Sequence, residues 1–238
     1  MDTWLHDLRF GLRTLARRPL FTLAAVIALG LGIGANGAIY SVFDAVLLSP
    51  LDYHQPERLV RLWGRHDGKG LEKSRISPVV FDDLRRQATS FETLAGWWRP
   101  DLNLTSGEGD PERVRAIHST DAFFEVLGVD PILGRGFAAG DDRPGGPAIA
   151  WLGHGLWSRR FGGEDVLGTS IELDGRSFEI VGVMPPGFDF PDGTELWLPL
   201  GWDPATHSRY ARFFGAVGRL ADGVSPETAV AELDRLAT

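Results

Sequence analysis

The sequence predicts an α+β protein in which one N-terminal transmembrane helix precedes a mixed α/β body of two subdomains. Three observations lead to this fold class. A run of 25 uncharged residues extends from Pro19 to Phe43. Short β-like and helix-like segments alternate after residue 50. The composition of the 238 residues, 43% hydrophobic and 24% charged, is that of a globular protein rather than a disordered chain.

Residues 1–18 predict an amphipathic helix that lies in the membrane interface. On a helix, Trp4 and four leucines fall on one side, beside a stripe of arginines. The segment has two aspartates and four arginines, and these arginines are Arg9, Arg13, Arg17 and Arg18. A short soluble amphipathic helix has the same pattern, but the position directly before an apolar run favours the interface.

The uncharged run predicts a transmembrane helix over residues 19–50. A helix of 25 residues reaches roughly 37 Å, and the hydrocarbon core of a bilayer is about 30 Å thick. Two alternatives are a buried soluble helix and a cleaved signal peptide. A soluble helix of this length normally has a polar face. A signal peptide has an apolar region of about 7–15 residues, whereas apolar residues here continue to Leu48. A retained span is therefore favoured.

The charges flanking the predicted span indicate its orientation. Basic residues precede the span, and the positive-inside rule places that end in the cytoplasm. The body over residues 51–238 then lies outside the cytoplasm, in the periplasm if the cell has an outer membrane. The chain has 20 basic and 30 acidic residues after position 18. The lipid bilayer is thus one predicted partner.

Small residues recur within the predicted span. Gly30 and Gly34 are four residues apart, and Gly32 lies four residues after an alanine. This spacing lets a second helix approach closely. Asn36 is the one strongly polar side chain of the run, and we expect it to seek a partner helix. Gly32 to Gly37 also matches GxGxxG, but a dinucleotide site requires a preceding strand in a soluble βαβ unit, so we reject that interpretation.

The body alternates predicted strands and helices. A serine and a proline at 77–78 mark one helix start, and Gly128 marks a helix end. Asp174-Gly175 between two β-like runs is a hairpin signal. Glycine and proline cluster in predicted loops over 139–147 and 185–191. The predicted strands cover 59–63, 148–152, 169–173, 177–183, 195–200 and 212–220, and the predicted helices cover 77–86, 121–127, 154–161 and 225–238.

Composition and motifs exclude several classes of function. The chain has no cysteine, which excludes disulfides and a thiol nucleophile. A net charge of −8 argues against nucleic-acid binding. Walker A, HExxH and GxSxG motifs are absent and the six histidines are scattered, so we expect neither an enzyme nor a cofactor or metal site. Acidic residues at 141–142, 189 and 192 lack calcium-loop spacing.

The eight tryptophans allow two interpretations. Trp97-Trp98, Trp151, Trp157, Trp197 and Trp202 either line a hydrophobic cleft or pack in the core. Large aromatic side chains bury much apolar area and dominate protein cores. Core packing is therefore the favoured interpretation.

Several segments together resemble the MacB-type ABC transporter permeases of the MacB/FtsX superfamily, and in particular its duplicated orphan permease branch. The resembling segments occur in order over almost the whole chain, which makes the match specific. They are Asp7–Arg13, Leu29–Val42, Phe123–Val129, Gly134–Phe137, Leu156–Gly162, Val181–Phe188, Val217–Leu220 and Gly223–Val224.

This resemblance implies a permease with four transmembrane helices and a large periplasmic domain between the first and second. The implied domain is α+β, with a porter-like part and an inserted part. It implies a cytoplasmic ABC ATPase as partner, together with the other permease helices, and a role in efflux or in transmitting ATP-driven motion. The sequence stops after the last periplasmic helix, so we expect a fragment that lacks three spans.

A second class of function remains open at this point. One helix is enough to hold an extracytoplasmic sensor or binding module at the membrane. The glycine-rich span with Asn36 favours the permease, because a lone membrane anchor has little use for a helix-packing face.

Overall fold

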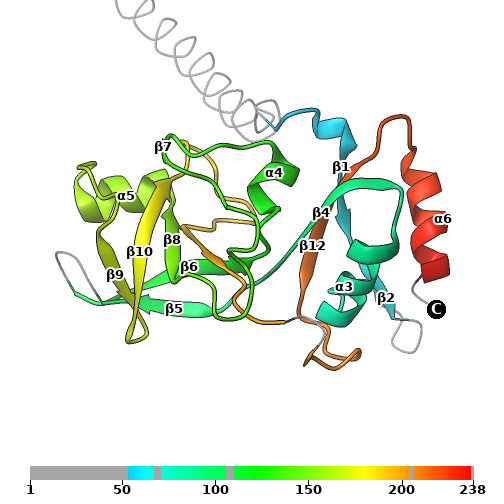
Figure 1. Ribbon diagram of the computed structural model, residues 1–238, viewed down its shortest axis with the longest axis horizontal. Coiled ribbons are helices and arrows are strands. Elements are labelled where there is room, and N and C mark those ends of the chain that lie inside the picture. Colours follow the sequence, from blue (N-terminus) through cyan, green and yellow to red (C-terminus); the bar gives the residue numbers. More distant parts are fainter. Residues whose placement is uncertain (1–52, 67–70, 106–109, 204–205, 237–238) are drawn as a thin grey trace, which may run out of the picture. The chain divides into compact units, whose positions relative to one another are not determined.

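The computed structural model describes residues 53–66, 71–105, 110–203 and 206–236, which form one compact unit over residues 53–238 (Figure 1). The strands are β1 (Leu59–Leu62), β2 (Gly64–His66), β3 (Leu71–Ser74), β4 (Phe91–Trp98), β5 (Asp101–Leu104), β6 (Glu112–Ser119), β7 (Leu133–Gly134), β8 (Ile149–Leu152), β9 (Ser170–Leu173), β10 (Arg176–Val183), β11 (Leu196–Pro199) and β12 (Gly215–Leu220). The helices are the 3₁₀-helix η2 (Pro56–Arg58) and the α-helices α3 (Pro78–Gln87), α4 (Phe123–Leu127), α5 (His154–Phe161) and α6 (Pro226–Leu236).

Six strands form a closed barrel. In the order β6-β11-β8-β10-β9-β5, each strand pairs with the next, and β5 pairs again with β6. The closing contact joins Leu104 of β5 to Leu173 of β9. Beside it, the Thr105 N–H donates to the Glu172 carbonyl at 3.0 Å, and Asn103 Nδ2 donates to Asp174 Oδ1 at 2.8 Å. A closed barrel leaves none of its strands with a free edge.

The barrel interior is one apolar cluster. Alternate residues of its strands point inward, such as Val114 and Ala116 of β6, both fully buried. The helix α5 adds Leu156 to the same cluster. The remaining members of this cluster are Leu104, Ala150, Leu152, Val166, Ile171, Leu173, Phe178, Ile180, Val183, Leu196 and Leu198.

The second part of the molecule, called here the helix-covered half, consists of β1, β12 and β4 with α3 and α6. β12 lies between β1 and β4 and is antiparallel to both. The connection β1–α3–β4 is thus a split βαβ unit. Phe81 of α3 and Ala229 of α6 pack on the sheet, in a cluster with Leu94 of β4 and Phe214 before β12.

Local sequence signals account for several predicted elements. Ser77 caps α3 by accepting the Val80 N–H at 3.1 Å, and Pro78 occupies the first turn. Gly128 ends α4 with φ 66°. Asp174 and Gly175 both have positive φ, as a tight two-residue hairpin requires. These predictions are confirmed.

Other predictions need correction. The sequence did not predict β4 and β6, which are eight residues each, or the short strands β2, β3, β5 and β7. The strand predicted over 212–220 begins only at Gly215, because Phe214 makes an isolated bridge to Ile76 instead. The barrel and the helix-covered half are two parts of the body, as expected, and one ten-stranded sheet continues through both of them.

The predicted leader consists of the interfacial helix over 1–18 and the span over 19–50, and it lies outside the described residues. In the part of the chain that the structure describes, no helix has the length and apolar character needed to cross a membrane.

A single carboxylate joins α6 to the start of β4. Glu232 Oε1 accepts the Thr89 N–H at 2.9 Å and the Thr89 hydroxyl at 2.7 Å, and Oε2 accepts the Ser90 N–H at 2.8 Å. These hydrogen bonds, those of Ser90 first, lower the pKa of Glu232 from 4.5 to about 2. The charged form therefore stabilises the position of α6.

We predict that residues 53–238 fold without the leader. This unit contains its own barrel interior and a second apolar cluster under α3 and α6. Its size is also sufficient for a stable core. Expressed alone, it should show one cooperative thermal transition by circular dichroism. A spectrum of a disordered chain would contradict this expectation.

We predict that Glu232→Gln lowers the free energy of unfolding by about 2 kcal/mol at pH 6, because charge-assisted hydrogen bonds are lost. The folded pKa lies below the unfolded one, so the carboxylate stabilises above pH 4.5 and loses this effect as the pH falls toward 2. The difference between wild type and variant should therefore shrink in urea titrations at pH 3. A difference independent of pH would contradict the role of the charge.

Candidate functional site: the junction between barrel and helix-covered half

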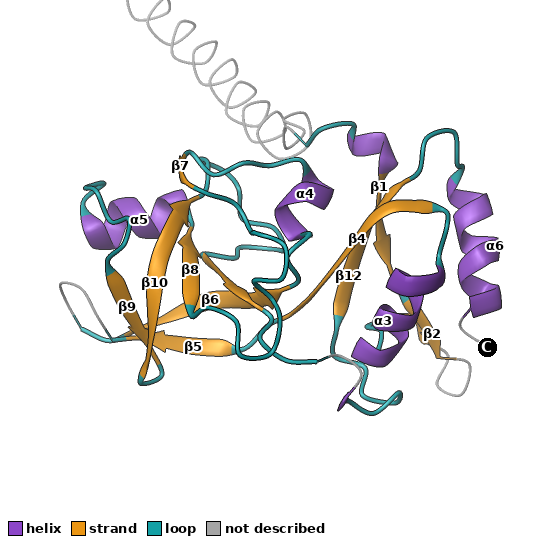
Figure 2. Cartoon of the chain, in the orientation of Figure 1, coloured by secondary structure: helices purple, strands orange, loops and turns teal. Residues whose placement is uncertain are grey.

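The strands β4 and β6 join the two parts of the molecule (Figure 2). Trp97 lies opposite Ser119 and Trp98 opposite His118, and these are the two residue pairs of this ladder. Thr120 extends the link, since its N–H donates to the Gly96 carbonyl at 3.0 Å and its hydroxyl accepts the Gly96 N–H at 3.1 Å. Among the described strands, this ladder is the pairing that connects the two parts.

An aromatic cluster fills the space behind the ladder. Trp97 and Phe190 meet edge to face with ring centroids 5.4 Å apart, and Phe188 stacks on Trp197 at 5.0 Å. Such pairs add to the stabilisation from burial alone. The Trp197 indole N–H donates to the Phe190 carbonyl at 3.0 Å. Phe123 and Phe124 of α4, together with Trp151 of β8, complete the cluster.

Glycines allow aromatic rings to lie against the strands of the helix-covered half. A Cβ atom on Gly96 would lie 2.1 Å from Cε1 of Phe214, and one on Gly215 would lie 2.4 Å from Cε2 of Trp97. Both rings belong to fully buried residues. Glycine in a strand often marks such a close approach. At each glycine, the aromatic ring occupies the space that a side chain would take.

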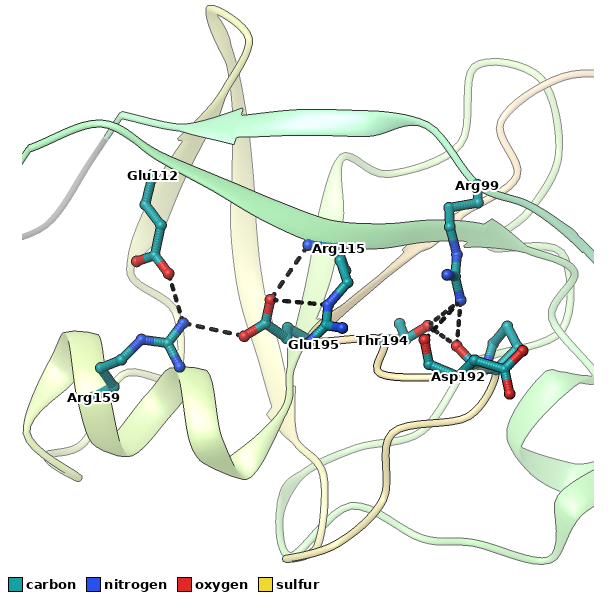
Figure 3. Close-up of polar contacts among 8 residues, drawn as sticks. Arg99, Glu112, Arg115, Arg159, Asp192, Thr194 and Glu195 are labelled. Carbon is teal, nitrogen blue, oxygen red and sulfur yellow. Dashed lines mark hydrogen bonds and ion pairs between the residues drawn. The ribbon is translucent and has the colours of Figure 1, made fainter.

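Arg99, directly after β4, holds the loop that precedes β11 (Figure 3). Its Nη2 donates to the carbonyls of Pro191 and Asp192, the latter at 3.2 Å, and contacts the Thr194 hydroxyl at 3.4 Å. The Thr194 hydroxyl itself donates to the Pro191 carbonyl at 2.6 Å. The loop is therefore fixed to the end of β4 by one side chain.

A row of charges continues along the barrel from this loop (Figure 3). Arg159 of α5 donates to Glu112 Oε1 at 2.7 Å and to Glu195 Oε1 at 3.1 Å. The other oxygen of Glu195 lies 3.8 Å from Nε of Arg115 on β6. The hydrogen bond that Arg159 donates to Glu112 is the main cause of the raised pKa of Arg159. These partly exposed pairs are each of modest energy, and together they orient α5 on β6 and β11.

Arg219 of β12 connects the sheet to α4. Its side chain is buried, and Nε and Nη2 both donate to the Val126 carbonyl, at 3.1 and 2.7 Å. A cation at the carboxyl end of a helix also complements the helix dipole. The contact joins the helix-covered half to the helix that covers the barrel side of the junction.

His118 stacks on Trp98 at the edge of the ladder, with ring centroids 5.4 Å apart and planes 15° apart. Its Nδ1 lies 2.7 Å from the Pro199 carbonyl. Burial lowers the pKa of His118 below 6.5. The imidazole is thus neutral at pH 7 and acts in packing between β6 and β11.

The junction has the character of a rigid connection. Its aromatic rings are packed, and Arg99, Thr120 and Arg219 form hydrogen bonds within it. In the described part of the chain, Trp98 Nε1, Ser119 Oγ and Arg219 Nη1 are buried without a hydrogen-bond partner. Across the described ranges, no group of three His, Cys, Asp or Glu side chains is placed to hold a metal ion.

A family comparison assigns the chain. The model of the family described as MacB-like periplasmic core domain matches residues 22–236. The chain belongs to this family. It contains a periplasmic domain of an ABC transporter permease of the MacB/FtsX type, as the resemblance of its segments predicted.

Solved structures share the fold of this MacB-like domain at low sequence identity. The periplasmic region of MacB from Actinobacillus actinomycetemcomitans is 16% identical, with a TM-score of 0.57 over 75% of this chain and 81% of that one. A domain of a putative permease protein from Porphyromonas gingivalis is 19% identical, with a TM-score of 0.59 over 79% and 85%. The extracellular domain of the noncanonic ABC-type transporter YknZ from Gram-positive bacteria is 14% identical, with a TM-score of 0.55 over 75% and 90%. A search of curated proteins returns no match.

The site residues predicted from the sequence of this MacB-like chain all belong to the leader. They lie outside the described residues, and they are Trp4, Arg9, Arg13, Arg17, Arg18, Gly30, Gly32, Gly34 and Asn36. The structure therefore does not test them.

The predicted packing role of the body tryptophans is confirmed. Trp97, Trp151 and Trp197 are fully buried in the junction cluster. Trp157 packs against the barrel interior, and Trp98 and Trp202 pack against the cluster under α3 and α6. The acidic loop residue Asp141 accepts hydrogen bonds from Arg135 and from the Ala138 N–H, both at 2.8 Å, which is a structural role.

We predict that Gly96→Ala lowers the free energy of unfolding by about 2 kcal/mol or more, because the added methyl group overlaps the Phe214 ring and overpacks the core. Urea unfolding followed by tryptophan fluorescence measures the change. Gly155→Ala is the matched control, since a Cβ there has open space on α5 and should stabilise by about 0.5–1 kcal/mol. Equal unfolding midpoints for both variants would contradict the close contact.

Proposed function

We propose that this chain is the membrane-anchored first part of an ABC-type permease, whose periplasmic body transmits motion driven by a cytoplasmic ATPase. The observation that carries the proposal is the extent of the family match, which begins at residue 22, inside the uncharged run, and ends at residue 236. The match thus covers most of the uncharged run together with the body. In this proposal residues 19–50 span the inner membrane and the body lies in the periplasm.

The construction of the junction supports a role in transmission. Movement at one part of the body reaches the other only if the connection is stiff. The ladder of β4 and β6, the aromatic cluster and the buried contact of Arg219 with Val126 provide three separate connections. A junction filled with packed aromatic rings resists compression, because protein interiors have few voids.

The proposal also assigns the role of the glycines in the leader. The remaining spans of the permease would pack against Gly30 and Gly34 on one side of the helix and against Gly32 on the other. Asn36 falls on the side of Gly32 and would hydrogen-bond to a span there. The basic residues Arg9, Arg13, Arg17 and Arg18, with Trp4, would hold the preceding helix at the cytoplasmic surface. The body has no part in catalysis in this proposal, since the ATPase supplies the energy.

We predict that replacing both Gly30 and Gly34 by leucine in the complete permease leaves membrane insertion intact but reduces co-purification of the ATPase and the other spans by about tenfold. Leucine adds hydrophobicity, but it holds the partner backbone away where close contact drives association. Carbonate-washed membranes report insertion, and affinity purification through a tag on the chain reports assembly.

Ala24→Leu serves as control, because it adds a similar side chain on a different side of the same helix and should leave assembly unchanged. Assembly that is equally strong in the double variant would contradict the permease proposal. It would instead support a single-span sensor or binding module, for which the helix surface is immaterial. Recovery of a shortened, soluble form of the wild type would contradict the retained span.

A further inference from the structure

The strand β1 has one edge that no other described strand covers. Its inner edge pairs with β12 from Leu59 to Leu62, and β1 ends the sheet on this side. The barrel at the other end of the sheet is closed, so the described strands expose this edge and not those of the barrel. An uncovered edge presents a row of backbone N–H and C=O groups that can pair with another extended segment.

A groove of about 670 Å³ lies beside β1, between this strand and the helices α3 and α6. Its lining includes five successive residues of the chain, from Val60 to Gly64, which places it at the strand itself. The helices α3 and α6 supply apolar walls, with Val80 and Leu84 on α3 and Val230 and Leu233 on α6. The groove therefore offers backbone pairing and apolar contacts in the same place.

Two exposed apolar side chains lie at the groove. Trp63 is 43% exposed and Val230 is 53% exposed. They are two of the five large hydrophobic residues that are exposed in the described ranges. Aromatic side chains with part of their surface in water are enriched at binding interfaces. The two residues stand on different elements, one after β1 and one on α6, so a segment in the groove would cover both.

The charges of the groove select the chemistry of its occupant. Lys73, Arg209 and Arg212 line it together with one acidic residue, Asp234. Arg209 already pairs with Asp83 at 2.6 Å, and Arg61 lies over the Trp63 ring at 4.5 Å, with Asp192 at 3.9 Å. The lining is thus mainly basic. A second copy of this chain would bring like charges together, which disfavours that pairing, whereas an acidic segment is complementary.

We propose that the β1 edge and this groove bind an extended acidic segment of a partner protein, which adds to the sheet as a further strand. Side chains alternate between the two faces of a strand. One set would enter the groove against Val230 and Leu233, and the other would lie beside Arg61, which is directly opposite Val217 in the register of β1 and β12. The partner segment therefore alternates apolar and acidic residues. This mode of recognition is β-strand addition.

The test uses the full chain in lipid nanodiscs and a fluorescent peptide of eight residues in which valine alternates with glutamate. Binding is measured by fluorescence anisotropy, and amide hydrogen exchange locates it. We expect binding with slowed exchange in residues 59–62. A peptide in which valine alternates with lysine should bind about tenfold more weakly or worse, because its charges are unfavourable. The acidic peptide with a central proline should also lose binding, because proline removes a backbone donor.

Variants of the chain separate the groove from the rest of the surface. Val230→Glu places a like charge in the groove and should weaken acidic-peptide binding by about tenfold. Ile132→Glu is the matched control, since Ile132 is 47% exposed but does not line the groove, and it should bind as wild type does.

Four results would overturn the proposal. These are equal binding of the acidic and lysine peptides, equal loss in both variants, unchanged exchange in residues 59–62, and slow exchange there before peptide is added. The last result would mean that the edge is already covered, by a second copy or by another segment of this chain. Size-exclusion chromatography would distinguish those two occupants.

Discussion

Two strands of the barrel are buried on both faces, and the other elements of the structure are arranged so that both faces of these strands are covered. β8 and β11 each have four consecutive buried residues. One face of each contributes to the barrel interior, through Leu152 and Leu198, and the other carries Trp151 and Trp197. The two tryptophans lie on the outer face of the barrel, so the barrel alone would leave them exposed to water. α4 and the long loops before β8 and β11 supply the second covering layer, and that layer is also the junction with the helix-covered half.

The sequence predicted the elements whose signals are local. The capped start of α3, the glycine end of α4 and the Asp174-Gly175 hairpin each depend on two or three adjacent residues. β6 was missed although Val114 and Ala116 alternate with two arginines, a pattern typical of a strand with one buried face. β4 was missed because its apolar residues run almost continuously and show no clear alternation. Barrel closure could not be predicted from the sequence, because Leu104 and Leu173 meet only when the five other strand pairings of the barrel are in place.

The junction illustrates a second limit of reading a sequence alone. The tryptophans were correctly expected in the core, because their size and apolar character favour burial wherever the chain brings them together. Their partners could not be predicted. Gly96 and Phe214 lie in distant parts of the chain, and the pairing of β4 with β12 brings them together. The Phe214 ring fills the space that a side chain at position 96 would need. Arg99, Arg159 and Arg219 each join segments far apart in sequence, and no local pattern indicates these partners.

The short ladder between β4 and β6 has a mechanical consequence. The barrel is hydrogen-bonded all the way round, so separating its strands would require breaking several ladders at once. The helix-covered half is held by six residue pairs between β12 and β4. The two pairs between β4 and β6 are few by comparison, and the aromatic cluster and the contact of Arg219 with Val126 reinforce them. A load applied across the body is therefore shared between backbone pairing and packed side chains, so the two parts move as one piece.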